Sequence, residues 1–111
     1  MKDYEAVRDE LGRSLRNKFE DREELRLKTF LYWKQNNLSN LSDGELSQEA
    51  SRASLAEGSN ASHTPDYVPG VGSPRSLALE LERKRRKADI SAEKIQRIAN
   101  QVKADYAEAD D

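Results

Sequence analysis

The sequence predicts an all-α protein built from two long amphipathic helices and one short helix. Two highly charged stretches, residues 2–37 and 74–106, carry apolar side chains at helical spacing along one face. A connector rich in Ser, Gly and Pro, residues 38–73, separates them. An apolar stripe must be covered by another helix. We therefore expect a helical hairpin or bundle that is completed by oligomerisation or by a partner.

The first long helix is expected over residues 2–37. Asn36 and Asn37 suit its end. Near that end Leu27 and Leu31 lie on the side opposite the main stripe, so this end should be covered from more than one direction. The stripe itself consists of Tyr4, Val7, Leu11, Leu15, Phe19, Leu25 and Trp33, with Phe30 and Tyr32 at its margins.

A shorter helix is expected at about residues 42–57. Ser42 and Glu45 have the spacing of a capping box, in which each side chain bonds the other residue's backbone N–H. Gly58 is placed where a left-handed glycine commonly ends a helix. The connector thus contains one element of regular structure.

The remainder of the connector, residues 58–73, has no hydrophobic period and contains several turn-forming residues. A structureless loop of this length is uncommon inside a compact domain. Two interpretations follow: a disordered tether, or an ordered hook that lies on a partner with Tyr67 and Val68 as anchors.

The second long helix, residues 74–106, begins with a clear signal. Ser73 suits the N-cap, and Pro74 occupies the first helical position, where its missing N–H costs nothing. Ser91 can also cap a helix, which predicts a kink or break near 89–91. An uninterrupted helix with Ser91 exposed to solvent is the alternative.

Composition excludes several classes of protein. The 111 residues include 19 Lys and Arg, 21 Asp and Glu and no Cys, which excludes disulfides and thiolate metal sites. Residues 107–111 form an acidic tail. No apolar run approaches the roughly 20 residues that span a bilayer, and the N-terminus lacks the apolar core of a signal peptide. We expect a cytoplasmic protein with no membrane partner.

The apolar stripes are the candidate protein interface. A lone two-helix hairpin would leave much of each stripe exposed to water, so we expect a homo-oligomer or a larger protein partner. On this hypothesis Leu15→Asp or Ile98→Asp abolishes association. The candidate interface residues are Leu11, Leu15, Phe19, Phe30, Trp33, Leu77, Leu81, Ile95, Ile98 and Val102.

A run of five consecutive cations in the second long helix is the sharpest chemical feature. One interpretation is contact with nucleic-acid phosphates, which would give affinity without sequence specificity. The other is a salt-bridged helix face, which Glu80 and Glu82 directly upstream favour. The candidate phosphate contacts are Arg22, Arg26, Arg83, Lys84, Arg85, Arg86 and Lys87.

No constellation of residues points to catalysis. His63 is the only histidine, and one His beside Asp66 makes neither a metal site nor a catalytic pair. We expect no cofactor, no metal and no small-molecule substrate. The sequence favours a non-enzymatic helical assembly or adaptor protein that acts through protein–protein contacts. The alternative is a small nucleic-acid-binding regulator or packaging factor that uses the basic run 83–87.

Overall fold

A computed structural model describes residues 9, 11, 15, 18, 19, 22–60 and 66–109 of the chain. It confirms the all-α class, because the chain is mostly helical and compact. Its Cα radius of gyration, 13.5 Å, is close to the value of about 13 Å expected for a compact domain of this length. The elements are α3 (Glu23–Gln35), the short 3-10 helix η1 (Leu38–Asn40), α4 (Asp43–Asn60), α5 (Pro74–Lys87) and α6 (Ala92–Ala109).

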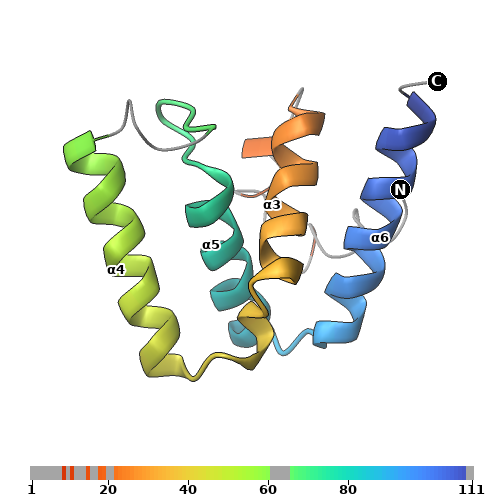
Figure 1. Cartoon of the computed structure of the whole chain (residues 1–111). Coiled ribbons are helices and arrows are strands. Elements are labelled where there is room, and N and C mark those ends of the chain that lie inside the picture. The colour runs from red at the N-terminus through yellow and green to blue at the C-terminus, as the bar shows by residue number, and fades with distance from the viewer. Residues whose placement is uncertain are drawn as a thin grey trace.

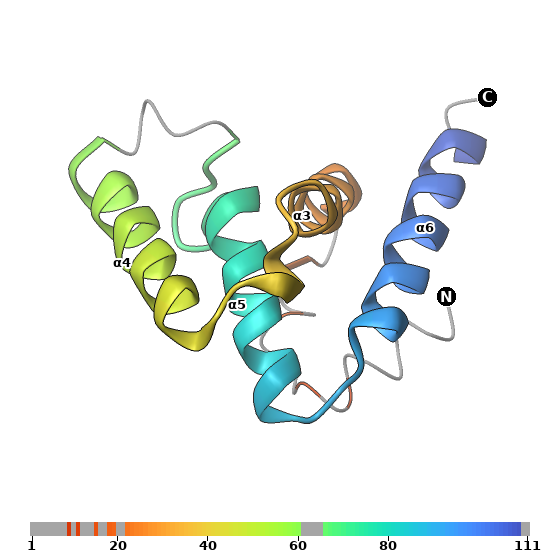
Figure 2. The same ribbon diagram turned by 60° about the horizontal axis from the view of Figure 1, so that its bottom comes forward.

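The four α-helices lie side by side in the order α4, α5, α3, α6 (Figure 1). Helices α4 and α6 run opposite to α3 and α5. Helix α3 packs against both α5 and α6, whereas α4 packs against α5. Figure 2 shows that α5 lies between α4 and α3. Helix α5 therefore connects the two sides of the molecule.

The prediction of one continuous helix over residues 2–37 is wrong. The chain breaks at Arg22, which has φ −131° and ψ 59° and whose N–H bonds the carbonyl of Phe19 at 3.0 Å. The break brings the ring centroids of Phe19 and Phe30 to 6.2 Å. On a straight helix these residues would lie about 16 Å apart. The gain from burying Leu15 and Phe19 against α3 thus outweighs the continuity of the helix.

The predicted end of this segment is confirmed within two residues. Helix α3 ends at Gln35, Asn36 follows as its C-cap, and Asn37 adopts the left-handed conformation with φ 51°. The chain then enters η1, where Leu38 is buried. This turn leads the chain from α3 to α4.

The capping box of the short helix is also confirmed. The N–H of Ser42 bonds Glu45 Oε1 at 3.0 Å, and the N–H of Glu45 bonds Ser42 Oγ at 3.1 Å. The end predicted at Gly58 is wrong, because α4 continues to Asn60. Among the described glycines only Gly70 and Gly72 have positive φ, so Gly58 does not close the helix.

Residues 66–73, the described part of the predicted loop, form an ordered turn. Val68 and Gly72 pair as an antiparallel bridge, and Val68 packs against the core. Gly72, with φ 127°, could not be replaced freely, since a Cβ there would lie 2.7 Å from Ser76 Oγ. These residues are thus ordered, as in the hook interpretation, but Val68 packs against the core of its own chain. Residues 61–65 lie outside the described residues.

The predicted break near 89–91 is confirmed. Asp89 is left-handed with φ 58°, its N–H bonds Arg86 O, and the N–H of Ile90 bonds Arg85 O at 3.0 Å. These bonds form a Schellman motif that ends α5. Ser91 Oγ then accepts from the N–H of Lys94 at 3.2 Å and starts α6. Helix α6 continues to Ala109, so it includes part of the segment predicted as an acidic tail.

The candidate interface residues lie in the core of this chain. The breaks near residues 22 and 90 let one chain cover its own stripes, so burying these residues requires no partner. Leu11 is partly buried and packs against the core. Nine of the ten are buried within the single chain: Leu15, Phe19, Phe30, Trp33, Leu77, Leu81, Ile95, Ile98 and Val102. Their burial within the single chain gives no support to an intermolecular role, so that assignment stays a prediction.

Candidate functional site

A buried carboxylate joins α3 to α5. Glu82 is 0% exposed, and its Oε1 accepts hydrogen bonds from Trp33 Nε1 and Arg85 Nε, both at 2.8 Å. Arg86 Nε donates to its Oε2. Burial raises the pKa of Glu82, but the hydrogen bonds from Arg85, Arg86 and Trp33 outweigh it and leave the pKa below its ordinary value. Glu82 is therefore a charged residue that is satisfied inside the fold.

Arg86 extends this network to the start of α4. Its Nη2 donates to the carbonyls of Leu38 and Leu41 at 3.1 and 2.6 Å, and its Nη1 bonds Asp43 Oδ1 at 2.8 Å. One guanidinium at the end of α5 thus binds three groups: the carbonyl of Leu38 in η1, the carbonyl of Leu41 just after it, and the carboxylate of Asp43, the first residue of α4. The position of α4 depends on this contact.

The basic run serves partly as an internal salt-bridged face. Besides Arg85 and Arg86, Lys84 bonds Glu80 at 3.1 Å, and Glu80 also bonds Lys18 at 2.6 Å. The other two cations, Arg83 and Lys87, are exposed and line a groove of about 490 Å³ between α4 and α5. The run is thus divided between internal ion pairs and this groove.

The candidate phosphate contacts on the first segment do not extend that groove. Arg22 and Arg26 are partly buried, and Arg22 Nη1 lies 3.5 Å from Lys18 O. Neither lines the groove that contains Arg83 and Lys87. The seven candidate cations therefore do not form a single set around that groove.

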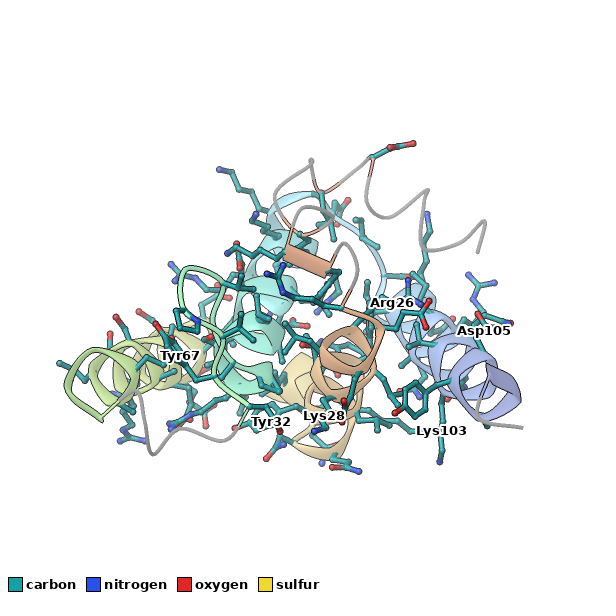
Figure 3. The ribbon with its side chains drawn as sticks, turned by 90° about the horizontal axis from the view of Figure 1, so that it is seen from above. Arg26, Lys28, Tyr32, Tyr67, Lys103 and Asp105 are labelled. Atoms are coloured by element: carbon teal, nitrogen blue, oxygen red, sulfur yellow. The ribbon has the colours of Figure 1, made fainter. Side chains whose placement is uncertain are left out.

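A second feature lies between α3 and α4. Two adjoining hollows, of about 470 and 320 Å³, share Tyr32 and together form what we call the α3/α4 trough. The start of α5, including Pro74, lines one end, and η1 lines the other. Figure 3 shows Lys28 and Tyr32 projecting from the same side of α3. The trough is thus open between two helices.

Helical spacing defines both walls of the trough. The α3 wall comprises Lys28, Leu31, Tyr32, Gln35 and Asn36, and these share one helix face. The α4 wall comprises Glu45, Gln48, Glu49, Arg52 and Ala56. Because each wall repeats at three- and four-residue intervals, the trough follows the helix axes and is not a round pocket.

One leucine lines the trough, and helical spacing places a second one beside its α4 wall. On α3, Leu31 is half-buried and lines the larger hollow. On α4, Leu55 is 71% exposed, and no other large hydrophobic side chain among the described residues is exposed. It lies three residues after Arg52 and seven after Gln48, so it continues their wall toward solvent. An exposed leucine beside an apolar hollow indicates a contact surface.

The two ends of the trough differ in charge. The lining of the larger hollow includes Lys28, Arg75 and one carboxylate, Asp66. Lys28 Nζ bonds Asp66 at 2.9 Å and also pairs with Glu24, outside the lining, at 3.0 Å. The smaller hollow carries Glu45 and Glu49 with one cation, Arg52. These charges are partly paired, since Glu49 lies 2.9 Å from Arg52 and 3.3 Å from Arg75. The trough therefore has a basic end and an acidic end.

Sequence reasoning missed this trough. One signal was present, because Leu31 lies opposite the main apolar stripe of its helix. Leu55 gave no such signal, since its helix shows only one narrow apolar face. The walls belong to two helices that both pack against α5, and no local pattern encodes that arrangement.

Within the described ranges, no three potential metal-binding side chains come together, and none of the helices there is long and apolar enough to cross a bilayer. No family model matches this chain, and the comparisons with curated proteins and with solved structures found no match. The physical features of the chain itself therefore carry the functional argument.

Proposed function

We propose that this protein is a non-enzymatic adaptor that binds a helix of another protein in the α3/α4 trough. The observation that carries the proposal is an open, partly apolar trough between two helical walls, which Leu31 lines and beside which helical spacing places the exposed Leu55. Amphipathic helices bind in such grooves through apolar side chains at three- and four-residue spacing. An adaptor function needs this kind of surface and no catalytic group.

Helix packing supports the choice of a helix as the occupant. Helices α4, α5 and α3 already form a row with α5 in the middle (Figure 2). A fourth helix placed between α3 and α4 would complete a four-helix arrangement, in which apolar faces meet in the centre. The walls follow the helix axes, which favours a helix over an extended strand.

The proposal takes a different protein, not a second copy, as the partner. Each described α-helix already buries its own apolar face: Phe30 and Trp33 on α3, Leu46 on α4, Leu81 on α5 and Ile98 on α6. Among the described residues of a second copy, Leu55 on α4 is therefore the one exposed large hydrophobic side chain that could enter the trough. Homo-oligomerisation is an outcome that the experiment below distinguishes.

Nucleic-acid binding through residues 83–87 is the less favoured function. Arg85 and Arg86 already bind the carboxylate of Glu82. The groove that contains the exposed Arg83 and Lys87 also contains Glu57 and Glu80, whose carboxylates oppose a phosphate backbone. Binding to duplex DNA or RNA that weakens steeply with salt, and that Arg83→Glu with Lys87→Glu removes, would support it.

Site-specific photocrosslinking in the native cell tests the adaptor function. A photoreactive amino acid replaces Gln35 on the α3 wall or Gln48 on the α4 wall, since both side chains are exposed. Both positions should crosslink to the same helical segment of one identified protein. That segment, made as a peptide, should bind the purified chain, and Ala56→Trp, which fills the larger hollow, should abolish binding.

A control position and the identity of the crosslinked protein distinguish the possible outcomes. The photoreactive group at exposed Glu93 on α6 is the matched control and should not give the same crosslink. A crosslink between two copies, with a sedimentation coefficient that rises with concentration, would replace the adaptor with a homo-oligomer. Absence of a common crosslinked segment at Gln35 and Gln48 would contradict the function.

A further inference from the structure

We infer that the α3/α4 trough binds its partner helix in one direction, with the amino end at Glu45 and the carboxyl end at Lys28 and Arg75. This inference rests on the proposed function, because it specifies the chemistry and polarity of the helix that the trough receives. It also states where the apolar and acidic residues of that helix must lie.

Charge complementarity fixes the direction. The end with two cations and one carboxylate favours the carboxyl terminus of a helix, which carries a partial negative charge. The end with two carboxylates and one cation favours the amino terminus. Since α3 runs from Lys28 toward Asn36, the bound helix runs opposite to α3 and in the same direction as α4.

The start of α5 adds to the same preference. Pro74 is the first residue of α5 and lines the basic end of the trough. A helix begins with a partial positive charge, so α5 contributes to the same potential as Lys28 and Arg75. This backbone contribution is independent of the ionised side chains.

Arg75 is the residue best placed to bind a carboxylate of the partner. Its Nη2 bonds Glu49 at 3.3 Å, a long distance for a charged pair, while its Nε is buried without a hydrogen-bond acceptor among the described residues. Its side chain is 34% exposed. The guanidinium thus retains capacity for an acidic side chain in the last turn of the bound helix.

The apolar anchors of the partner belong in its carboxyl-terminal half. The larger hollow, at the basic end, includes Leu31, Tyr32, Ala56 and Pro74. The smaller hollow, at the acidic end, contains Glu45, Gln48, Glu49 and Arg52. The expected partner helix therefore has polar residues on the inner face of its first turns, two or three large apolar residues after them, and an acidic last turn.

A displayed library of helical peptides of about 14 residues, with all inner-face positions randomised, tests this inference. Selection uses the full-length wild-type chain, and peptides that also bind Ala56→Trp are removed. The expected products carry apolar residues in the carboxyl-terminal half and Asp or Glu in the last turn. Lys28→Gln with Arg75→Gln should weaken their binding at least tenfold, whereas Lys94→Gln (half-buried) with Arg97→Gln (exposed) on α6 should change it less than twofold. This pair is a matched control, because it also removes two cations that are exposed or half-buried.

A spin label on the selected peptide reads the direction itself. A nitroxide at the carboxyl end should broaden the amide signals of Lys28 and Ala56, and one at the amino end should broaden those of Glu45 and Gln48. The opposite broadening, or an acidic first turn in the selected peptides, overturns the direction and leaves the proposed function intact. Failure to enrich any peptide that discriminates wild type from Ala56→Trp overturns both.

Discussion

The indole N–H of Trp33 donates a 2.8 Å hydrogen bond to the fully buried carboxylate of Glu82, across the contact between α3 and α5. The same carboxylate also binds Arg85 and Arg86, so one anion orders an aromatic side chain and two cations. Arg86 in turn binds the start of α4. The relative positions of α3 and α4, and hence the width of the α3/α4 trough, are therefore linked through Glu82.

Neutralising Glu82 should be among the most destabilising changes of charge in this protein. Glu82→Gln keeps the size of the side chain but leaves Arg85 and Arg86 without their buried anion, which should lower the free energy of unfolding by about 3–5 kcal/mol. Urea denaturation followed by circular dichroism measures this value. The matched control, Glu93→Gln at an exposed position of α6, should change stability by less than about 0.5 kcal/mol. Equal midpoints for the two variants would contradict the role of Glu82.

Removing the Arg86 guanidinium should release α4 before it unfolds the rest of the protein. Arg86→Met loses the bonds to Leu38 O, Leu41 O and Asp43 that hold η1 and the start of α4. Hydrogen exchange should therefore accelerate at least tenfold in α4 and η1, with a smaller change in α6. Arg83→Met, at an exposed position of the same helix, is the control and should leave the α4 pattern unchanged. Uniform acceleration across all helices would refute a specific tether.

Local sequence signals correctly predicted where helices start, at positions where hydrogen bonds within a few residues determine the start. Ser42 with Glu45, Ser73 with Pro74, and Ser91 each begin a helix as expected. These caps depend on side chains that reach their own backbone, so distant packing does not alter them. The position of helix starts was therefore largely predictable.

Features that depend on distant contacts were not predictable. The break at Arg22 exists because Phe19 packs on Phe30, and helical periodicity gives no sign of that contact. Glu82 has the sequence spacing of an ordinary surface ion pair with Arg85 and Arg86, yet it is fully buried. The α3/α4 trough requires α5 to separate two segments that are close in sequence. Each of these outcomes depends on tertiary packing.

Truncating Ile98 should reveal it as a core residue of the single chain. Ile98 is 0% exposed, so Ile98→Ala should cost about 2–5 kcal/mol of stability through lost burial and a cavity. Each protein, wild type or variant, should have the same urea midpoint at about 5 μM as at about 100 μM, because the unfolding of a monomer does not depend on its concentration. A midpoint that rises with protein concentration would restore Ile98 to an intermolecular interface.

Acid should destabilise the protein through Glu80 as well as Glu82. Burial raises the pKa of Glu80, but the hydrogen bonds from Lys18 and Lys84 outweigh it, so the folded-state pKa lies below the ordinary value. A lowered folded-state pKa stabilises the fold above the unfolded-state pKa of about 4.3, and this contribution is lost as pH falls through the folded-state value. The free energy of unfolding should decrease steadily below about pH 4.5. Glu80→Gln should show a shallower decrease than wild type or Glu93→Gln, and identical slopes would argue against this ion-pair contribution.

Leu55 should matter for binding but not for folding. Its side chain is 71% exposed, and helical spacing places it beside the α4 wall of the α3/α4 trough, so replacing it removes little buried apolar area from the free protein. Leu55→Gln, which retains a good helix former, should change stability by less than about 0.5 kcal/mol. It should weaken a peptide selected for the trough about tenfold in fluorescence anisotropy, because the bound helix would cover this side chain. Ser51→Gln, one turn earlier on α4 and also exposed, should leave affinity unchanged. Unaltered affinity in Leu55→Gln would show that the bound helix does not reach the outer rim of α4, and a large loss of stability would show that Leu55 supports the fold itself.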